Sequence, residues 1–316
     1  MSGLESTRRA RVTWLVILAL LIAAPFLGMY PVFLAKLMCY AIFACAFNLL
    51  FGFTGLLSFG HAAFLGAAAY TTGWLTRSAH LSPELGVLAG TAVAAVLGLV
   101  IGLLAIRREG IYFAMITLAL AQMLYFVCLQ APFTGGEDGL QGVPRGELFG
   151  LISLQNGLAL YFVVLAVFVA VFLFIVRIVH SPYGQVLKAI RENEPRAISL
   201  GYDVVRYKLL AFVLSAALAG LAGSMKAVVL GFASLTDVHW GLSGEVILMT
   251  LLGGVGTFAG PVIGAFTIIG LQNFLADQVG SWINVIIGVI FVICVVAFRK
   301  GFVGELLAWQ ARRKAR

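Results

Sequence analysis

The chain has 316 residues, of which 62% are hydrophobic and only 11% are charged, and its mean hydropathy is +1.05. Soluble globular domains carry about 25% charged residues and about half apolar ones, so this composition excludes an ordinary soluble fold. The 21 Lys and Arg residues exceed the 13 Asp and Glu residues and give a net charge of +8, but a nucleic-acid-binding protein is far less apolar. We therefore expect an all-α polytopic membrane protein, whose positive charge reflects its orientation in the membrane.

Nine stretches are apolar and long enough, or nearly so, to cross a bilayer, which takes about 20 residues in a helix. The first follows Arg8, Arg9 and Arg11, as in a signal peptide, but no small-residue cleavage site follows it, so we expect a retained span. The sequence thus predicts a cytoplasmic N-terminus (1–13), a single transmembrane domain (14–298) and a basic cytoplasmic tail (299–316). The nine stretches are residues 14–29, 32–53, 59–76, 85–106, 111–130, 157–179, 207–231, 246–275 and 282–298.

The stretch 246–275 is too long for one ordinary span. Its middle, from Gly253 to Pro261, contains four glycines besides the proline, a composition that breaks helices. We expect a broken segment there, either a re-entrant pair or two short spans, which gives eight to ten crossings in all.

The distribution of basic residues predicts the topology, because positively charged loops stay in the cytoplasm. With the N-terminus inside, Arg107 and Arg108 fall inside after four spans, and the basic region 177–208 falls inside after six. The tail 299–316 is cytoplasmic only if 246–275 enters the membrane and returns. On this layout 17 of the 21 Lys and Arg residues are cytoplasmic or at inner ends of spans.

The sequence lacks the motifs of several classes of enzyme. The sequence contains no G-x-x-x-x-G-K-[ST], H-E-x-x-H or G-x-S-x-G motif and no Cys/His cluster. We therefore expect no catalytic residue, no metal site and no cofactor on this chain, and no ATP hydrolysis by it. Cys39, Cys45, Cys128 and Cys294 lie in apolar stretches without paired spacing, as small free hydrophobic residues do.

The long polar loop 180–206 has the pattern of two short helices. Apolar residues lie among charged ones at helical spacing, which predicts an amphipathic helix over 185–194. The apolar residues are Val186, Leu187, Ala189 and Ile190. Pro195 ends or restarts this helix, and Gly201 is a plausible helix stop. A plain solvated loop explains the charge but not the apolar faces. A short helix with one apolar face suits the groove of a partner protein.

This loop is similar to the coupling loop of bacterial ABC-importer permeases, whose Ala-x-x-x-Gly ending is matched by Ala197 and Gly201. It departs from the general importer pattern at Pro195, where that pattern has Glu; Glu194 lies one place earlier. Five stretches, in the expected order, resemble the permeases for branched-chain amino acids and related amides. They are 189–194 (AIRENE) with Ala197 and 207–223 (YKLLAFVLSAALAGLAG), 52–55 (GFTG) with 58–62 (SFGHA), 112–118 (YFAMITL), 134–139 (TGGEDG), and 253–257 (GGVGT) with 260–261 (GP).

The resemblance implies a permease subunit in the bacterial inner membrane, in contact with membrane lipid. It would form half of a translocation path, together with a second, homologous permease subunit, two cytoplasmic ATPase subunits that bind the ATP, and a periplasmic or lipid-anchored substrate-binding protein. No nucleic acid is implied. The residues implied to contact the ATPases are Gln185, Ala189, Arg191, Glu192, Glu194, Arg196, Ala197 and Gly201.

Polar residues inside predicted spans either line a path or form hydrogen bonds between helices. The candidates for path-lining residues are Asn48, Ser58, His61, Thr117, Gln122 and Asn273. For most of them the hydrogen-bonding role is favoured, and His61, among small residues at a helix start, is the exception.

Two acidic outer stretches are candidates for docking a substrate-binding protein, although both also suit plain exposed connections. Their acidic residues are Glu137 and Asp138 in one stretch, and Asp237 and Glu245 in the other. We expect Lys226, near the end of its span, to extend its amine to the outer interface.

The resemblance implies branched-chain amino acids (Leu, Ile and Val) as the solutes. Urea or short amides are the alternative, because the family motifs belong to the scaffold and not to the ligand. A stand-alone channel or ion-coupled carrier is less favoured, because no acidic residue lies deep in a predicted segment to relay protons or sodium ions.

Overall fold

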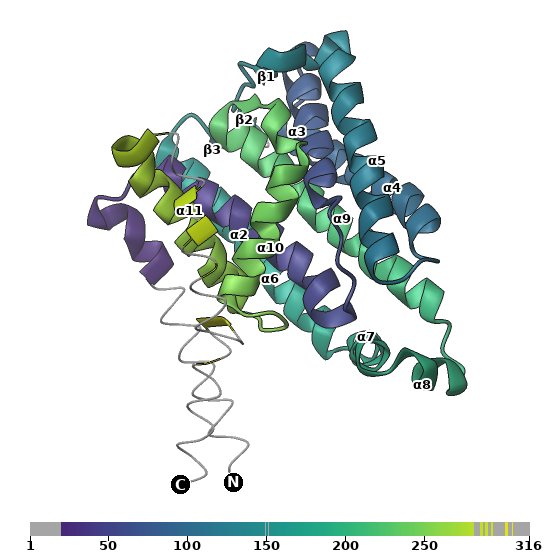
Figure 1. Ribbon diagram of the computed structural model, residues 1–316. Helices are drawn as coiled ribbons and strands as arrows, with labels where there is room; N and C mark the ends of the chain where they lie inside the picture. The colour runs from purple at the N-terminus through teal and green to yellow at the C-terminus, as the bar shows by residue number, and fades with distance from the viewer. Residues whose placement is uncertain are drawn as a thin grey trace, which may run out of the picture.

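The computed structural model describes residues 20–148, 150, 152–280 and eight later positions (285, 286, 288, 289, 292, 301, 302 and 305). The N-terminus 1–13, residues 14–19 of the segment 14–29, and most of the segment 282–298 and of the tail 299–316 lie outside the described residues. In the described part the chain is a bundle of helices (Figure 1). The all-α class predicted from the composition is thereby confirmed.

The helices correspond to the seven predicted segments between residues 32 and 275, although the helix that begins at Trp240 starts six residues before the predicted segment 246–275. The helices are α2 (Pro31–Thr54), α3 (His61–Ser78), α4 (Pro83–Ala105), α5 (Ile111–Gln130), α6 (Gly157–His180), α7 (Pro182–Glu192), α8 (Glu194–Ser199), α9 (Val204–Leu230), α10 (Trp240–Gly253) and α11 (Gly260–Val279), with the 3-10 helices η1 (Ala24–Leu27), η2 (Pro132–Thr134), η3 (Gly136–Asp138) and η4 (Leu235–Asp237).

Four two-residue strands form two small antiparallel pairs. β1 (Leu140–Gln141) pairs with β4 (Phe232–Ala233), and β2 (Glu147–Leu148) pairs with β3 (Ile152–Ser153). The pair of β1 and β4 lies at one end of the bundle, which we call the β1 end. Helices α7 and α8 lie at the opposite end, which we call the α7 end (Figure 1).

Helix α2 lies in the middle of the bundle and is packed by α6, α9, α10 and α11 (Figure 1). It is apolar on all sides, and most of its residues are buried, as expected of a helix enclosed by others. Pro31 lies in its first turn, where a missing N–H costs no hydrogen bond. Gly55, with φ +83°, ends it in the left-handed conformation that glycine adopts without strain.

A row of small residues lets α4 and α9 approach closely. Gly90, Ala94, Gly98 and Gly102 recur every four residues along one face of α4. A Cβ added at Gly98 would lie 2.4 Å from the Cβ of Ala216 on α9. A Cβ added at Gly90 would lie 2.4 Å from a side-chain hydroxyl that is also on α9. Close backbone contact of this kind is how helices associate within a membrane.

The segment 246–275 is broken where its glycines predict. Helix α10 ends at Gly253, and α11 begins at Gly260. The two helices form an antiparallel hairpin, because Gly253 faces the backbone of Gly260 and Gly264 faces that of Met249. The turn 254–259 lies at the α7 end, so the segment goes through the bundle and returns (Figure 1).

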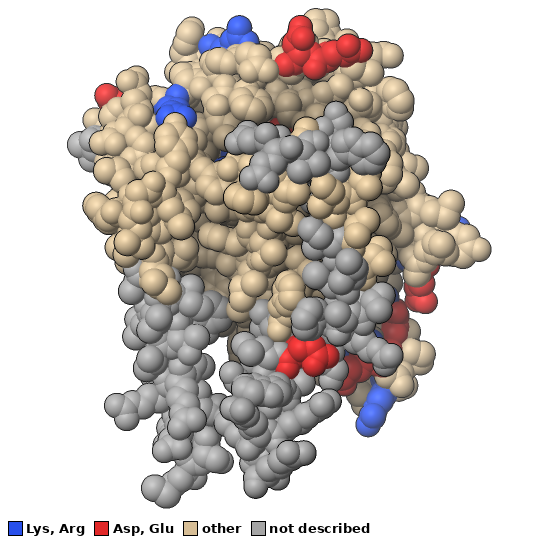
Figure 2. Space-filling model, turned by 60° about the vertical axis from the view of Figure 1, so that its left-hand side comes forward, with Lys and Arg blue, Asp and Glu red and all other residues tan. Residues whose placement is uncertain are grey.

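The helices have the length and composition of a polytopic membrane protein. Among the described residues, α2, α4, α5, α6 and α9 are long and apolar enough to cross a membrane, and α10 and α11 are shorter apolar helices. Figure 2 shows that on one face charged side chains gather near the two ends, while the broad band between them shows almost none. Cys39, Cys45 and Cys128 are buried free thiols, as predicted; Cys294 is outside the described residues.

A glycine at the crossing of α3 and α9 offers a test of this packing. A Cβ at Gly223 would lie 2.0 Å from the carbonyl oxygen of Leu65, so the Gly223→Ala variant must separate the two helices. We expect a loss of about 1–3 kcal/mol of stability and a lower unfolding temperature in detergent, measured by size-exclusion chromatography after heating. Gly244→Ala is the control, because nothing lies within 4 Å of its Cβ position; equal melting of the two variants would contradict the close crossing.

Candidate functional site

The loop between α6 and α9 folds into two helices that meet at Asn193. The hydroxyl of Ser181 accepts a hydrogen bond from the Gly184 amide (3.3 Å) and caps α7. The Asn193 side chain accepts one from the Arg196 amide (3.0 Å) and caps α8. Pro195 lies in the first turn of α8, so it restarts the helix. The sequence alone does not single out Asn193, although Asn is a favoured N-cap residue. Its capping role depends on where α7 ends and α8 begins.

A small core and an ion pair fix this helix pair to the start of α9. Ile190, Ala197 and Val204 are buried against one another. The Lys208 amine, itself only 5% exposed, contacts both carboxylate oxygens of Glu194 at 2.6 Å. Glu194 and Ala197, both predicted to contact ATPases, therefore hold the loop together in this chain.

Two tyrosines add a further connection between α7 and α9. The rings of Tyr183 and Tyr207 stack with their centroids 5.6 Å apart, and the Tyr183 hydroxyl donates to the Tyr207 carbonyl (3.0 Å). Burial, with the neighbouring Tyr207, raises the pKa of the Tyr183 phenol above its ordinary value. The phenol therefore stays protonated and able to donate.

The outer side of the helix pair is exposed and partly apolar. Ile198 is 58% and Leu200 69% exposed, with Tyr202 and Val205 beside them on the chain. We call these four residues the α8 tip. Gly201, with φ +85°, adopts the left-handed conformation at the end of α8. The other predicted contact residues, all exposed, are Gln185, Ala189, Arg191, Glu192 and Arg196.

Arg191 reaches from α7 to the end of α2 and to the turn between α10 and α11. Its guanidinium Nη1 donates a hydrogen bond to the carbonyl of Gly52. A Cβ at Gly55 would lie 3.2 Å from the Arg191 Cγ, and one at Gly256 would lie 3.1 Å from Nη1. Glycines at these positions thus leave the space that the arginine side chain occupies.

Asn48 completes this connection from inside the bundle. Its side-chain oxygen accepts from the Gly256 amide (3.0 Å), and its nitrogen donates to the Thr257 carbonyl (2.9 Å). We call Arg191, Asn48, Gly52, Gly256 and Thr257 the Arg191 junction. It joins α7, the end of α2 and the turn 254–259, which are distant in sequence.

His61 lies in an apolar cage and not at an open surface. It is fully buried, with the rings of Phe47, Phe64 and Phe212 packed edge-on against its own. The Ser215 hydroxyl donates to a backbone carbonyl of α2 (2.6 Å), so it accepts from the His61 Nε2 (2.8 Å). His61 thus joins α2, α3 and α9 in this structure, and its position on a path stays a prediction.

The remaining candidates for the path differ in their exposure. Ser58 and Thr117 are fully buried; they accept from the amides of Gly60 (3.2 Å) and Phe59 (3.2 Å), respectively. Gln122 is half-buried on α5, and Asn273 is exposed on α11. Four of the candidates, Asn48, Ser58, His61 and Thr117, are buried and hydrogen-bonded. A position on a path stays a prediction for all six.

The acidic residues predicted for docking separate into two kinds. Glu137 and Asp138 are exposed at the β1 end. Asp237 is only 3% exposed and forms a salt bridge with Lys226, itself 5% exposed. Asp237 therefore offers no carboxylate to a docking protein, and Lys226 does not extend to the outer interface. Both expectations are corrected, because the two charges neutralise each other inside the protein.

Glu245 departs from its predicted setting as well. It lies within α10 and is half-buried, not in an outer connection. Glu245 therefore lies in a helix, one residue before the start of the predicted segment 246–275. Among the described residues, no group of three His, Cys, Asp or Glu residues is arranged to hold a metal ion.

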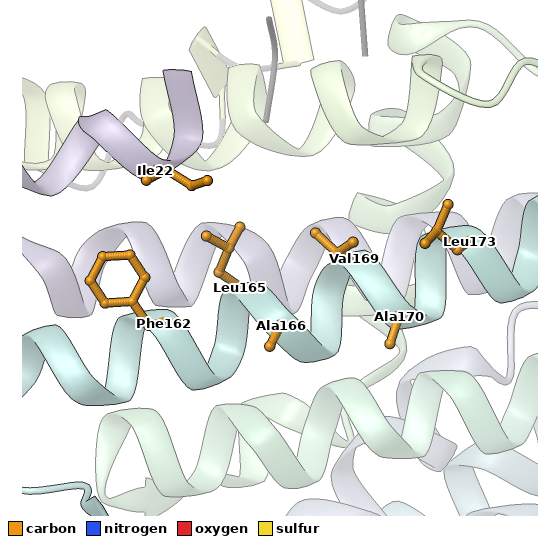
Figure 3. Close-up of a pocket in the computed structure, with 7 residues that line it drawn as sticks. All are labelled: Ile22, Phe162, Leu165, Ala166, Val169, Ala170 and Leu173. Atoms are coloured by element: carbon orange, nitrogen blue, oxygen red, sulfur yellow. The ribbon is translucent and has the colours of Figure 1, made fainter. Parts of the chain in front are cut away.

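An open, apolar groove runs along α6. Figure 3 shows that its lining comes from one face of α6 and from Ile22 across it. A groove without polar groups does not suit a charged or polar solute. Its residues are Ile22, Phe162, Leu165, Ala166, Val169, Ala170 and Leu173.

Comparison with known proteins identifies the family. The family model described as branched-chain amino acid transport system / permease component matches residues 29–295. The high-affinity branched-chain amino acid transport system permease protein LivM of Escherichia coli (strain K12) is 29% identical over 302 residues, which cover 86% of this chain and 70% of that protein. A probable branched-chain amino acid transport permease protein LivM of Methanocaldococcus jannaschii is 24% identical over 262 residues, covering 71% of this chain and 75% of that protein.

No solved structure matches the chain. The matching region contains every helix from α2 to α11 and includes both the α7–α8 pair and the α10–α11 hairpin. The chain belongs to the family of permease components of branched-chain amino acid transport systems.

Proposed function

We propose that this chain is a transmembrane subunit of an ATP-driven importer that forms half of the path for branched-chain amino acids. The observation that carries the proposal is the α7–α8 pair, which presents the exposed α8 tip and is tied to two membrane helices through the Arg191 junction. An exposed apolar tip on a rigid helix pair suits a groove in a partner protein. The relatives described above are permease proteins of branched-chain amino acid transport systems, which supports the solute class.

The proposal requires partners, because the chain has no phosphate-binding motif of its own. Two cytoplasmic ATPase subunits would bind the α7–α8 pairs of this chain and of a second, homologous permease subunit. A periplasmic or lipid-anchored binding protein would deliver the solute at the β1 end, where Glu137 and Asp138 are exposed.

The positive charges support an orientation with the α7 end in the cytoplasm. Eight of the twelve Lys and Arg residues between positions 20 and 280 lie at that end, in the region 107–108 and the region 177–208. Cytoplasmic loops carry such an excess. We therefore infer a multi-pass protein of the bacterial inner membrane with both termini in the cytoplasm.

The solute and the energy source can be tested together. Gentle solubilisation of the membranes should recover this chain with two ATPases and a second permease. Leucine uptake should stop when ATP is depleted and persist when the ion gradient is collapsed. Recovery of the chain alone, with uptake that follows the gradient, would instead indicate a channel or an ion-coupled carrier. Uptake of urea or short amides, but not of leucine, would indicate the other solute class.

The Arg191 junction predicts a specific defect in coupling. Arg191→Gln removes the charged group that joins α7 to the end of α2, and a hydrogen bond to a charged group contributes about 1.5–3 kcal/mol. We expect leucine uptake to fall about tenfold or more, while the ATPases still co-purify because the α8 tip is unchanged.

Arg108→Gln serves as the matched control, since Arg108 is exposed at the same end and belongs to no part of the junction. The measurement is the ratio of leucine transported to ATP hydrolysed in proteoliposomes. An unchanged ratio in Arg191→Gln, or loss of the ATPases from the purified complex, would refute the role assigned to Arg191.

A further inference from the structure

Four charged side chains meet near the β1 end of the bundle, on four different elements. Lys36 comes from α2, Lys226 from α9, Asp237 from η4 and Glu245 from α10. Lys226 and Asp237 are buried and neutralise each other in a salt bridge. The Lys226 amine also lies 5.7 Å from the centre of the Tyr40 ring, one helical turn from Lys36 on α2. This pair is fixed and has no charge left for a ligand.

Lys36 and Glu245 are the other two charges, and they are placed differently. Both are half-buried. In the part of the chain that the structure describes, no carboxylate lies within 4.0 Å of the Lys36 amine. Gln272 of α11 lies beside Glu245, whose charge interacts with those of Lys36 and Lys226 across the cluster. Two opposite charges thus lie near each other without direct contact.

We propose that Lys36 and Glu245 bind the charged backbone of a free amino acid, with the ligand carboxylate at Lys36 and the ligand ammonium group at Glu245. The inference rests on the proposed function and specifies its solute class. Half-buried charges without direct partners are costly, and a zwitterion would pair with both of them. The Lys226–Asp237 pair is neutral, so the net charge of the four groups is near zero.

The same geometry disfavours urea and short neutral amides. A neutral solute would leave the charges of Lys36 and Glu245 unpaired, and sites built for polar groups reject analogues that lack them. The apolar side chain of the solute contributes nothing to this selection. The site therefore selects the zwitterionic backbone and leaves discrimination among side chains to other parts of the transporter.

The helices that carry this site also carry the Arg191 junction. Lys36 and Asn48 lie on α2, 12 residues or about 18 Å apart along the helix axis. Glu245 and Gln272 lie on the two helices that the turn 254–259 connects. Pairing of a solute with Lys36 and Glu245 would thus act on the elements that Arg191 holds at the opposite end.

The first test uses the isosteric change Glu245→Gln and the change Lys36→Gln in the complete importer, reconstituted with a saturating amount of leucine-loaded binding protein. We expect leucine uptake to fall about tenfold or more in each variant, as when a charged hydrogen-bond partner is removed. ATPase stimulation by the loaded binding protein should stay within about twofold of wild type, a small change in free energy. Glu109→Gln is the control, since Glu109 is exposed at the α7 end.

Uptake at the wild-type rate in both variants would overturn this site while leaving the importer intact. Failure of the wild-type complex to transport any amino acid would instead overturn the proposed function. Parallel loss of uptake and of ATPase stimulation would show that the two charges act in assembly of the complex and not in solute binding, which also contradicts the site.

A second measurement needs no variant. Radiolabelled leucine is bound to the wild-type complex without binding protein and is competed with leucinamide, which lacks the carboxylate, and with 4-methyl-2-oxopentanoate, which lacks the ammonium group. We expect unlabelled leucine to compete and both analogues to fail at the same concentration. Equal competition by either analogue, or absence of leucine binding, would contradict the site.

Discussion

Irregular backbone at the end of a membrane-spanning hairpin must find hydrogen-bond partners within the protein. The turn 254–259 meets this requirement through Asn48, whose amide bonds one N–H and one carbonyl of the turn. Arg191 donates to the neighbouring carbonyl of Gly52. These hydrogen bonds hold the end of α2, the turn of the hairpin and α7 together. The relative position of the three segments at that end depends on them.

The close packing of glycines makes the junction specific. A Cβ at Gly52 would lie 2.1 Å from the Asn48 side-chain oxygen and 2.8 Å from the Gly256 amide nitrogen. Any larger residue would separate the helix end from the turn. In the proposed transport cycle, closure of the ATPases would move α7, and Arg191 would transmit that movement to the turn without an intervening flexible segment. Packed elements of this kind shift between discrete arrangements and do not deform continuously.

Much of the fold could be predicted from the sequence, because hydrophobic length and helix-breaking residues are local signals. The bounds of α4, α5 and α6 and the break between Gly253 and Gly260 follow from such signals. The partners of buried polar groups cannot be predicted from such local signals. Asn48 and Gly256, or Lys226 and Asp237, meet only when helices pack, so Asp237 was wrongly predicted to be exposed. The exposed Arg191 was predicted to face a partner, but its contact with Gly52 could not be read from spacing.

The central claim is that α7 and the turn 254–259 move as one unit. The most direct measurement is the distance between spin labels at Lys188→Cys on α7 and Val255→Cys in the turn, taken in the complete transporter without nucleotide and with ATP bound. If α7 and the turn 254–259 move as one unit, this distance stays constant within roughly 2 Å, the size of an ordinary helix shift, while transport proceeds. A change of about 5 Å or more, the size of a one-turn slip between packed elements, would show that the two segments move independently and would contradict the account.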